Sequence, residues 1–348
     1  MGDSQDVTKG EIGSFFPYPE LDPSDVAESK RKSPTWPPRS WSLLNSGRAA
    51  LQQVLDSHGV GHPQGVLWLP SYYCSEVTRY VQRNTPIRVY PCNPTDQSLP
   101  SDIPPDDLLL IVSYFGAEPP AHSLDPSQVV LDTTHDPLAP WIDDYRAGWV
   151  IGSLRKTLPL PEGGFAHSSR STSPSLAEPR PSDESRQVAQ QGAVAMITKA
   201  RWLAGDPSTD KDEWYRELQQ HEDAFDRLDP ASLLPENEQL LRSLPVKSWR
   251  QVRLSNLAFL REHLPPLRWA VQLPATYGLV LVCISQEVAD TVRGKLVSQG
   301  VYPARLWPQP EGSREPDTDL ANRILVIHTD HRYTRTQIAG VVQLLKIV

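Results

Sequence analysis

The chain has 348 residues, a formal net charge of −8 and a pI near 5.6, with 22% charged and 39% hydrophobic residues. This length is sufficient for one large domain and a smaller one. The acidic balance disfavours nucleic-acid binding, which needs a basic surface. No apolar run approaches the roughly 18 residues of a membrane span. The polar, acidic start of the chain contains no signal-peptide core, so we expect a cytoplasmic protein.

The first part of the chain predicts a layered α/β unit. Residues 1–40, with closely spaced prolines, are expected to be irregular, and a helix capped by Asn45 or Ser46 is expected over 45–57. Further along, we predict strands at 65–69, 87–90, 108–112, 129–131 and 148–152, and a helix at 75–82. Continuous apolar strands separated by crossovers favour a mostly parallel sheet covered by helices, whose ligands bind at the carboxyl ends of the strands.

The composition changes after the predicted strands. Residues 166–191 are rich in Ser, Pro and charged residues, which predicts a long flexible loop. We then predict helices at 192–204, 211–227, 236–243 and 248–263, a strand at 279–284, a helix at 286–298, a strand at 324–328 and a helix at 335–347. The predicted organisation is therefore a large domain over 41–245 and a small α+β domain over 246–348.

A first candidate binding motif lies at the predicted helix start, where Ser46, Gly47 and Arg48 follow one another. Glycine permits close backbone approach, and a helix N-terminus attracts negative charge, so this segment suits a phosphate group. The alternative is an ordinary capped helix.

A second motif follows the apolar run at 129–131, which ends in Asp132 with His135 three residues on. A carboxylate at the end of a strand suits a partner for a protonated pyridine nitrogen. Asp132 can equally be a turn residue, and His135 a histidine without a catalytic role.

The third motif centres on Lys156, which directly follows the predicted strand at 148–152. A lysine that forms a Schiff base must be held rigidly near its cofactor. Ser153, three residues earlier, is a second candidate for phosphate binding, and the following Gly163-Gly164 pair permits tight backbone approach. The alternative is a solvated loop lysine.

Five segments taken in order resemble the DegT/DnrJ/EryC1/StrS aminotransferase family, whose members are fold-type I enzymes that use pyridoxal 5′-phosphate. The resemblance spans about residues 40–165 and continues more faintly into the C-terminal part. The matching segments are Ser46-Gly47, Leu69-Pro-Ser-Tyr-Tyr-Cys74, Tyr114-Phe115-Gly116, Asp132-Thr-Thr-His135, and the run from Ser153 through Lys156 to Gly164. The fold implied by this resemblance is a large domain with a mostly parallel sheet, plus a small α+β domain.

The resemblance also implies roles for individual residues. Lys156 matches the lysine that forms the internal aldimine and shuttles a proton, Asp132 the partner of the pyridine nitrogen, and His135 the residue beside the ring. Tyr72 or Tyr73 is expected to stack on the ring, although strict alignment places Cys74 there. The expected phosphate ligands are Ser46, Gly47, Arg48 and Ser153.

The C-terminal half supplies weaker candidates. His328 and Arg332 lie in segments that approach the substrate pocket in relatives, so both are expected substrate contacts. Arg250 and Arg253 share a helical face that can meet either an anion or solvent. The His-x-Asp-His cluster beginning at His328 matches no standard set of metal ligands, and no metal is expected.

The chain departs from the family pattern in three places. The serine lies three residues before the lysine rather than five, Arg48 replaces a threonine, and the Gly-x-Asn-x-Arg segment is missing. The leading hypothesis is an aminotransferase that moves an amino group from a donor such as glutamate to a keto sugar or another small carbonyl substrate. A lyase, dehydratase or racemase with the same cofactor, and a non-catalytic binding protein, are the alternatives. The resemblance further implies a homodimer.

Overall fold

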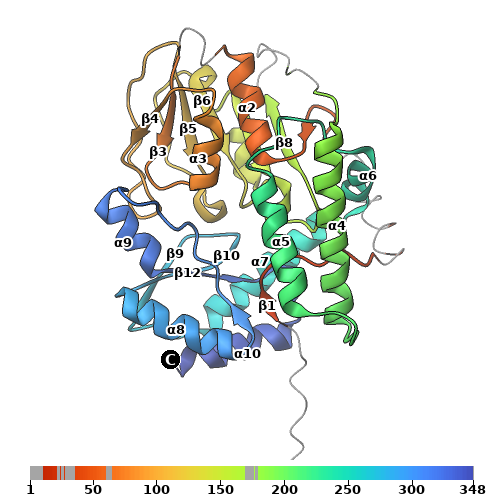
Figure 1. Ribbon diagram of the computed structural model, residues 1–348. Coiled ribbons are helices and arrows are strands. Elements are labelled where there is room, and N and C mark those ends of the chain that lie inside the picture. Colours follow the sequence, from red (N-terminus) through yellow and green to blue (C-terminus); the bar gives the residue numbers. More distant parts are fainter. Residues whose placement is uncertain are drawn as a thin grey trace, which may run out of the picture.

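The computed structural model describes residues 11–21, 24, 27, 36–59, 65–168, 176 and 179–347. In Figure 1 a large sheet with its covering helices lies above a small sheet with its own helices, and α4 and α5 run alongside both. The predicted boundary between residues 245 and 246 coincides with the start of α7.

The large sheet is seven-stranded and mostly parallel, as predicted. The strand order is β2-β8-β7-β6-β5-β3-β4, in which β3 to β7 pair in parallel while β8 and β2 are antiparallel. Because parallel strands all end at one edge, the residues that follow β5, β6 and β7 come together. The strands are β2 (Ser42–Leu44), β3 (Leu67–Pro70), β4 (Ile87–Tyr90), β5 (Leu108–Val112), β6 (Val129–Asp132), β7 (Trp149–Ser153) and β8 (Gly164–Ser168).

The helix predicted over 45–57 is α2 (Gly47–Ser57), and it packs on this sheet. Ser46 is its N-cap, because its hydroxyl accepts a hydrogen bond from the Ala49 N–H at 3.1 Å. The apolar face of α2 is fully buried, with Leu51 and Val54 among its members. The next helix is α3 (Ser75–Val81), close to its predicted range.

The small unit contains an antiparallel sheet in the order β12-β10-β9. Its strands are β9 (Ala270–Leu273), β10 (Gly278–Cys283) and β12 (Ile324–His328), and its helices are α7 (Val246–His263), α8 (Gln286–Ser298), α9 (Glu315–Arg323) and α10 (Arg335–Lys346). Part of the N-terminal segment expected to be irregular is a strand: β1 (Ile12–Gly13) pairs in parallel with β11 (Val301–Tyr302). The rest of residues 1–40 is largely outside the described part of the chain.

The loop predicted for residues 166–191 is wrong at both ends. Its beginning belongs to β8, and from Asp183 onward it is the helix α4 (Asp183–Leu203). The Ser182 side chain caps α4 by accepting from the Ser185 N–H, and two acidic residues follow in the first turn. Residues 169–175 and 177–178 lie outside the described residues.

Helices α5 (Lys211–Ala224) and α6 (Pro235–Ser243) follow α4, and α4 packs directly against α5. Gly192 of α4 makes this close approach possible, because a Cβ there would lie 2.3 Å from Nε2 of His221 on α5. Within the described residues, no helix has the length and apolar character of a bilayer-spanning segment.

A buried ion-pair cluster joins the large unit to α7. Asp136, which follows β6, is fully buried and receives hydrogen bonds from Arg250 and Arg253 of α7 and from Thr276, the shortest at 2.8 Å each. Of the two expectations for the paired arginines, an anion or solvent, the structure supports the first, and the anion is a carboxylate of the same chain.

Substitution of Asp136 by Asn is expected to lower the free energy of unfolding by about 3 kcal/mol or more, because two arginines would lose a buried counter-charge. Urea denaturation measures this change. Asp319→Asn is the matched control, since it removes a half-exposed partner of Arg323 and is expected to cost under about 1 kcal/mol. Equal losses in the two variants would contradict a joining role for Asp136.

Candidate active site

A cavity of ≈ 320 Å³ lies at the carboxyl ends of β5, β6 and β7. Lys156 and Asp132, which the resemblance places at opposite ends of one cofactor, both line it. The predicted site residues on its wall are Ser46, Gly47, Arg48, Tyr73, Asp132, His135, Ser153 and Lys156. Three other predicted residues, Tyr72, His328 and Arg332, are not among its lining residues.

Asp132 is the last residue of β6 and is buried at the cavity wall. One carboxylate oxygen accepts a 2.6 Å hydrogen bond from the Tyr73 hydroxyl, and the other accepts from the Thr134 N–H at 2.9 Å. Burial raises the pKa of Asp132, and the Thr134 and Tyr73 hydrogen bonds oppose this effect. Each oxygen retains acceptor capacity, so the carboxylate can accept one further N–H from a molecule in the cavity.

The His135 ring is held in one orientation beside Asp132. Its Nδ1 accepts a hydrogen bond from the Phe115 N–H at 3.1 Å, so the neutral ring carries its proton on Nε2. Phe115 has a left-handed backbone (φ 55°), and its carbonyl accepts from the N–H groups of Thr276 and Tyr277. Burial and the nearby Lys156 charge lower the pKa of His135 to about 3, which keeps the ring neutral.

The N-terminus of α2 forms the cavity wall nearest to β7 and β8. A Cβ on Gly47 would lie 3.1 Å from the Ser153 backbone nitrogen, and a Cβ on Gly164 would lie 2.1 Å from the Ser46 carbonyl oxygen. Glycine is therefore required at Gly164, and it brings β8 against the start of the helix. The first N–H groups of a helix have no partner within the helix, so they are available to an anion.

Arg48 adds a positive charge at this helix terminus. Its guanidinium is buried and lies 3.2 Å from an Asp226 carboxylate oxygen. Within the described residues, its buried Nε has no hydrogen-bond partner. A donor without a partner at the edge of a cavity is suited to a bound anion.

Lys156 ends a short 3₁₀ turn (Leu154–Lys156) that directly follows β7. Its carbonyl oxygen accepts a hydrogen bond from the Tyr277 hydroxyl at 3.2 Å, which ties the turn to the small unit. Its side chain is 44% exposed, and Nζ lies 3.4 Å from an oxygen of Glu222. The backbone of the lysine is thus fixed by packing, and its amine is held by one ion pair.

Several residues on this wall were not predicted from the sequence. They are Glu222 of α5, Tyr277 of the small unit and Phe15, and Trp307 lines the same cavity. The Trp307 ring stacks on His135 at 5.4 Å between ring centroids. No local pattern distinguishes these residues, because each reaches the cavity from a distant segment through tertiary packing.

Of the two tyrosines predicted to stack on a cofactor ring, only Tyr73 lines the cavity. Tyr72 is fully buried, and its hydroxyl donates to the Leu306 carbonyl at 2.7 Å. Cys74, the residue that strict alignment selects, also lines the cavity.

His328 and Arg332, the predicted substrate contacts, line a second cavity of ≈ 680 Å³ that shares Lys156, Glu222 and Phe15 with the first. The Arg332 guanidinium donates two hydrogen bonds to the Asp330 carboxylate, from Nε at 2.8 Å and from Nη2 at 2.9 Å. Arg332 is therefore already paired with a carboxylate of this chain.

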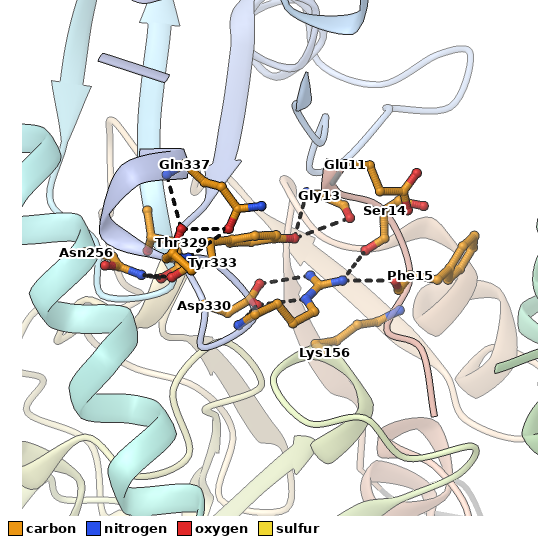
Figure 2. A network of polar contacts seen from close by, with 12 residues as sticks. Glu11, Gly13, Ser14, Phe15, Lys156, Asn256, Thr329, Asp330, Tyr333 and Gln337 are labelled. Atoms are coloured by element: carbon orange, nitrogen blue, oxygen red, sulfur yellow. Dashed lines mark hydrogen bonds and ion pairs between the residues drawn. The ribbon is translucent and has the colours of Figure 1, made fainter. Parts of the chain in front are cut away.

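The segment that contains Glu11 to Phe15 closes one side of the second cavity, and Figure 2 shows it beside Lys156 and Asp330. The Phe15 carbonyl accepts hydrogen bonds from Arg332 at 3.0 Å and from Lys199 at 2.7 Å. Glu11 pairs with Lys199 and, at 3.1 Å, with Lys211. These contacts hold Phe15 at the junction of the two cavities.

No group of three or more His, Cys, Asp or Glu side chains in the described residues is arranged to hold a metal ion. Within the cluster that begins at His328, the His331 ring instead stacks on Trp249, with 3.7 Å between centroids.

Solved sugar aminotransferases have a similar fold. DesI, determined in the presence of its TDP-sugar product, has a TM-score of 0.57 at 15% identity and is covered over 92% of its length by 97% of this chain. DesV from S. venezuelae, in complex with a ketimine intermediate, gives 0.58 at 15%, with 90% of it and 96% of this chain covered. The PLP form of Spr1654 from Streptococcus pneumoniae, a proposed sugar aminotransferase, gives 0.58 at 12%, with 98% of it and 97% of this chain covered. No protein-family model and no curated protein matches the sequence.

These similarities confirm the predicted fold class, an α/β fold of the fold-type I transferases with a mostly parallel central sheet. Identities this low establish the fold alone, and function depends on the site. The roles of the individual site residues therefore stay predictions.

A buried carboxyl group stabilises the loop between Lys156 and β8. Oε1 of Glu162 accepts hydrogen bonds from the Leu234 N–H and the Asn237 side chain, both at 2.8 Å. Burial raises the pKa of Glu162 from its ordinary value of 4.5 to about 7. The folded protein therefore keeps this proton at pH values where the unfolded chain has lost it, so the stability contributed by protonated Glu162 falls as pH rises from about 4.5 to about 7 and changes little above that.

Removal of this titration by Glu162→Gln is expected to flatten the pH dependence of stability. The wild type should lose about 3 kcal/mol more unfolding free energy than the variant between pH 4.5 and pH 8. Urea denaturation at both pH values measures the difference, and Glu262→Gln, which changes an exposed residue of α7, is the control. Parallel pH profiles for wild type and Glu162→Gln would contradict a buried, protonated Glu162.

Proposed function

We propose that this protein is a pyridoxal 5′-phosphate-dependent aminotransferase that moves an amino group from a donor such as glutamate to a keto sugar or another small carbonyl substrate. The observation that carries the proposal is the position of Lys156, Asp132 and the N-terminus of α2 around a single cavity. The pyridoxal phosphate form of Spr1654 has the same fold.

The residues of the cavity fit this cofactor at three separate points. The partnerless Nε of Arg48 and the first turn of α2, near Ser46, Gly47 and Ser153, suit its phosphate. The Asp132 carboxylate suits its ring nitrogen, and the Lys156 amine suits its aldehyde. When bound, the cofactor supplies an electron sink that stabilises a carbanion on the substrate carbon.

The chain's own residues then have distinct functions. The Asp132 carboxylate, fixed by Tyr73 and Thr134, orients a protonated ring nitrogen. Lys156 Nζ holds or moves a proton next to the reacting carbon. The neutral His135 is stacked against Phe115 and Trp307, and it contributes one hydrogen-bond donor, Nε2–H.

The second cavity is the proposed space for the carbonyl substrate, because Lys156 lies on the walls of both cavities. His328 and Arg332 are on its wall. Because Arg332 is paired with Asp330 and burial lowers the pKa of His328 to about 4, we assign His328 a neutral substrate contact.

Two alternatives keep part of this account. A lyase, dehydratase or racemase would use the same cofactor residues on an amino acid without a carbonyl acceptor. A non-catalytic binding protein would not need a lysine amine beside a carboxylate in a cavity. We further propose that the protein is cytoplasmic and forms a homodimer; light scattering of the cofactor-loaded protein tests the dimer.

Lys156→Ala is expected to abolish the visible absorbance that wild-type protein acquires with pyridoxal 5′-phosphate, because no amine would remain to bond the aldehyde. Lys247→Ala, which removes an exposed lysine of α7, should leave the absorbance unchanged. A visible spectrum recorded after gel filtration checks both variants. An undiminished band in Lys156→Ala would contradict the assignment.

Addition of glutamate to the loaded protein is expected to release one equivalent of 2-oxoglutarate with loss of the visible band, because an aminotransferase stores the amino group on its cofactor. Enzymatic assay of the keto acid in a single turnover measures this half-reaction, and a panel of other amino donors extends it. Catalytic turnover of an amino acid without an acceptor would favour the lyase, dehydratase or racemase alternative.

A further inference from the structure

Glu222 occupies a position in the site that the proposed reaction does not explain. It lies in the last turn of α5, and its carboxylate forms a bidentate pair with Arg155, at 2.9 and 3.1 Å. The same carboxylate lies 3.4 Å from Lys156 Nζ. A single anion thus contacts two consecutive cations, one buried and one facing the cavity.

The surroundings of Glu222 fix its place. The Arg155 side chain is only 5% exposed, and its guanidinium lies 4.0 Å from the centre of the Phe225 ring. The adjacent His221 packs against Gly192 of α4 so closely that a Cβ there would clash. The carboxylate is therefore held by a rigid helix pair and a bidentate partner rather than by a mobile side chain.

The charge state of Glu222 is also fixed. Burial alone would raise its pKa, but Arg155 and Lys156 outweigh burial and hold the pKa of this carboxyl well below its usual range. Glu222 is therefore a carboxylate near neutral pH and is a poor acceptor of a proton from the lysine.

We propose that Glu222 is a positioning residue that holds the Lys156 nitrogen at the junction of the two cavities and stabilises its protonated forms. This inference rests on the proposed function, since it concerns the lysine that would bond the cofactor. Arg155 is the partner that keeps Glu222 in place and charged.

The geometry explains why such an anchor is needed. The Lys156 side chain is 44% exposed, and a long unpaired lysine samples many rotamers. Both Lys156 and Glu222 line the cofactor cavity and the neighbouring cavity. A carboxylate at this junction restricts the Lys156 nitrogen to the region that is open to both cavities.

The test is the pH titration of the visible band in the cofactor-loaded Glu222→Gln variant. Loss of a negative charge 3.4 Å from the nitrogen should move the titration midpoint to lower pH by about one unit or more. We also expect the rate of 2-oxoglutarate release from glutamate to fall roughly tenfold or more, with less than about a threefold change in the Kd of the cofactor.

Two further variants separate positioning from a general effect on folding. Glu222→Asp keeps the charge but shortens the side chain. Its titration midpoint should therefore stay close to that of the wild type, while the rate of 2-oxoglutarate release still falls. Glu213→Gln makes the same chemical change on the exposed face of α5 and should alter neither quantity. An unchanged midpoint in a folded Glu222→Gln variant would overturn the proposal.

The outcome for the wild type distinguishes the two levels of inference. A wild type that acquires no visible band refutes the proposed function and, with it, any role for Glu222 toward the cofactor. A wild type with the band, beside a Glu222→Gln variant that titrates identically, refutes the positioning role alone.

Discussion

The parallel register of β6 and β7 is the constraint on which the site depends. This register pairs Asp132 with Ile151, so that the carboxylate at the end of β6 and the turn after β7 emerge at the same edge of the sheet. Lys156 follows Ile151 by five residues, in the turn after β7, and lines the same cavity as Asp132. A shift of one residue between these strands would direct Asp132 to the opposite face of the sheet.

Much of the large sheet was predictable, because fully buried parallel strands are continuous apolar runs. β4 (Ile87–Tyr90) and β5 (Leu108–Val112) coincide with their predicted ranges. The strands β2 and β11 were missed because two or three residues are too few to show an alternating or continuous apolar pattern. The strand β8 was missed because Gly164 and His167 interrupt its apolar residues. The start of α4 was missed because the Ser-, Pro- and charge-rich composition of this stretch is typical of a loop, although Ser182 caps the helix.

The site was predictable only where it is local in sequence. Ser46, Asp132 and Lys156 each belong to a strand end or helix start, and all three line one cavity. Glu222 belongs to a strongly polar helix whose pattern is typical of a solvated surface, so only the packing of α5 against the turn after β7 reveals it. Arg332 was predicted to contact a substrate, but its guanidinium is bound to Asp330, a pairing that sequence spacing alone did not identify.

The most direct test of the central claim is chemical. Reduction of the cofactor-loaded protein with borohydride, followed by proteolysis and peptide mass spectrometry, identifies the residue that bonds the cofactor aldehyde. We predict a single pyridoxyl group on the peptide that contains Lys156, and its loss in Lys156→Ala. Modification of another lysine in its place, such as the buried Lys199, or no modification at all, would contradict the account.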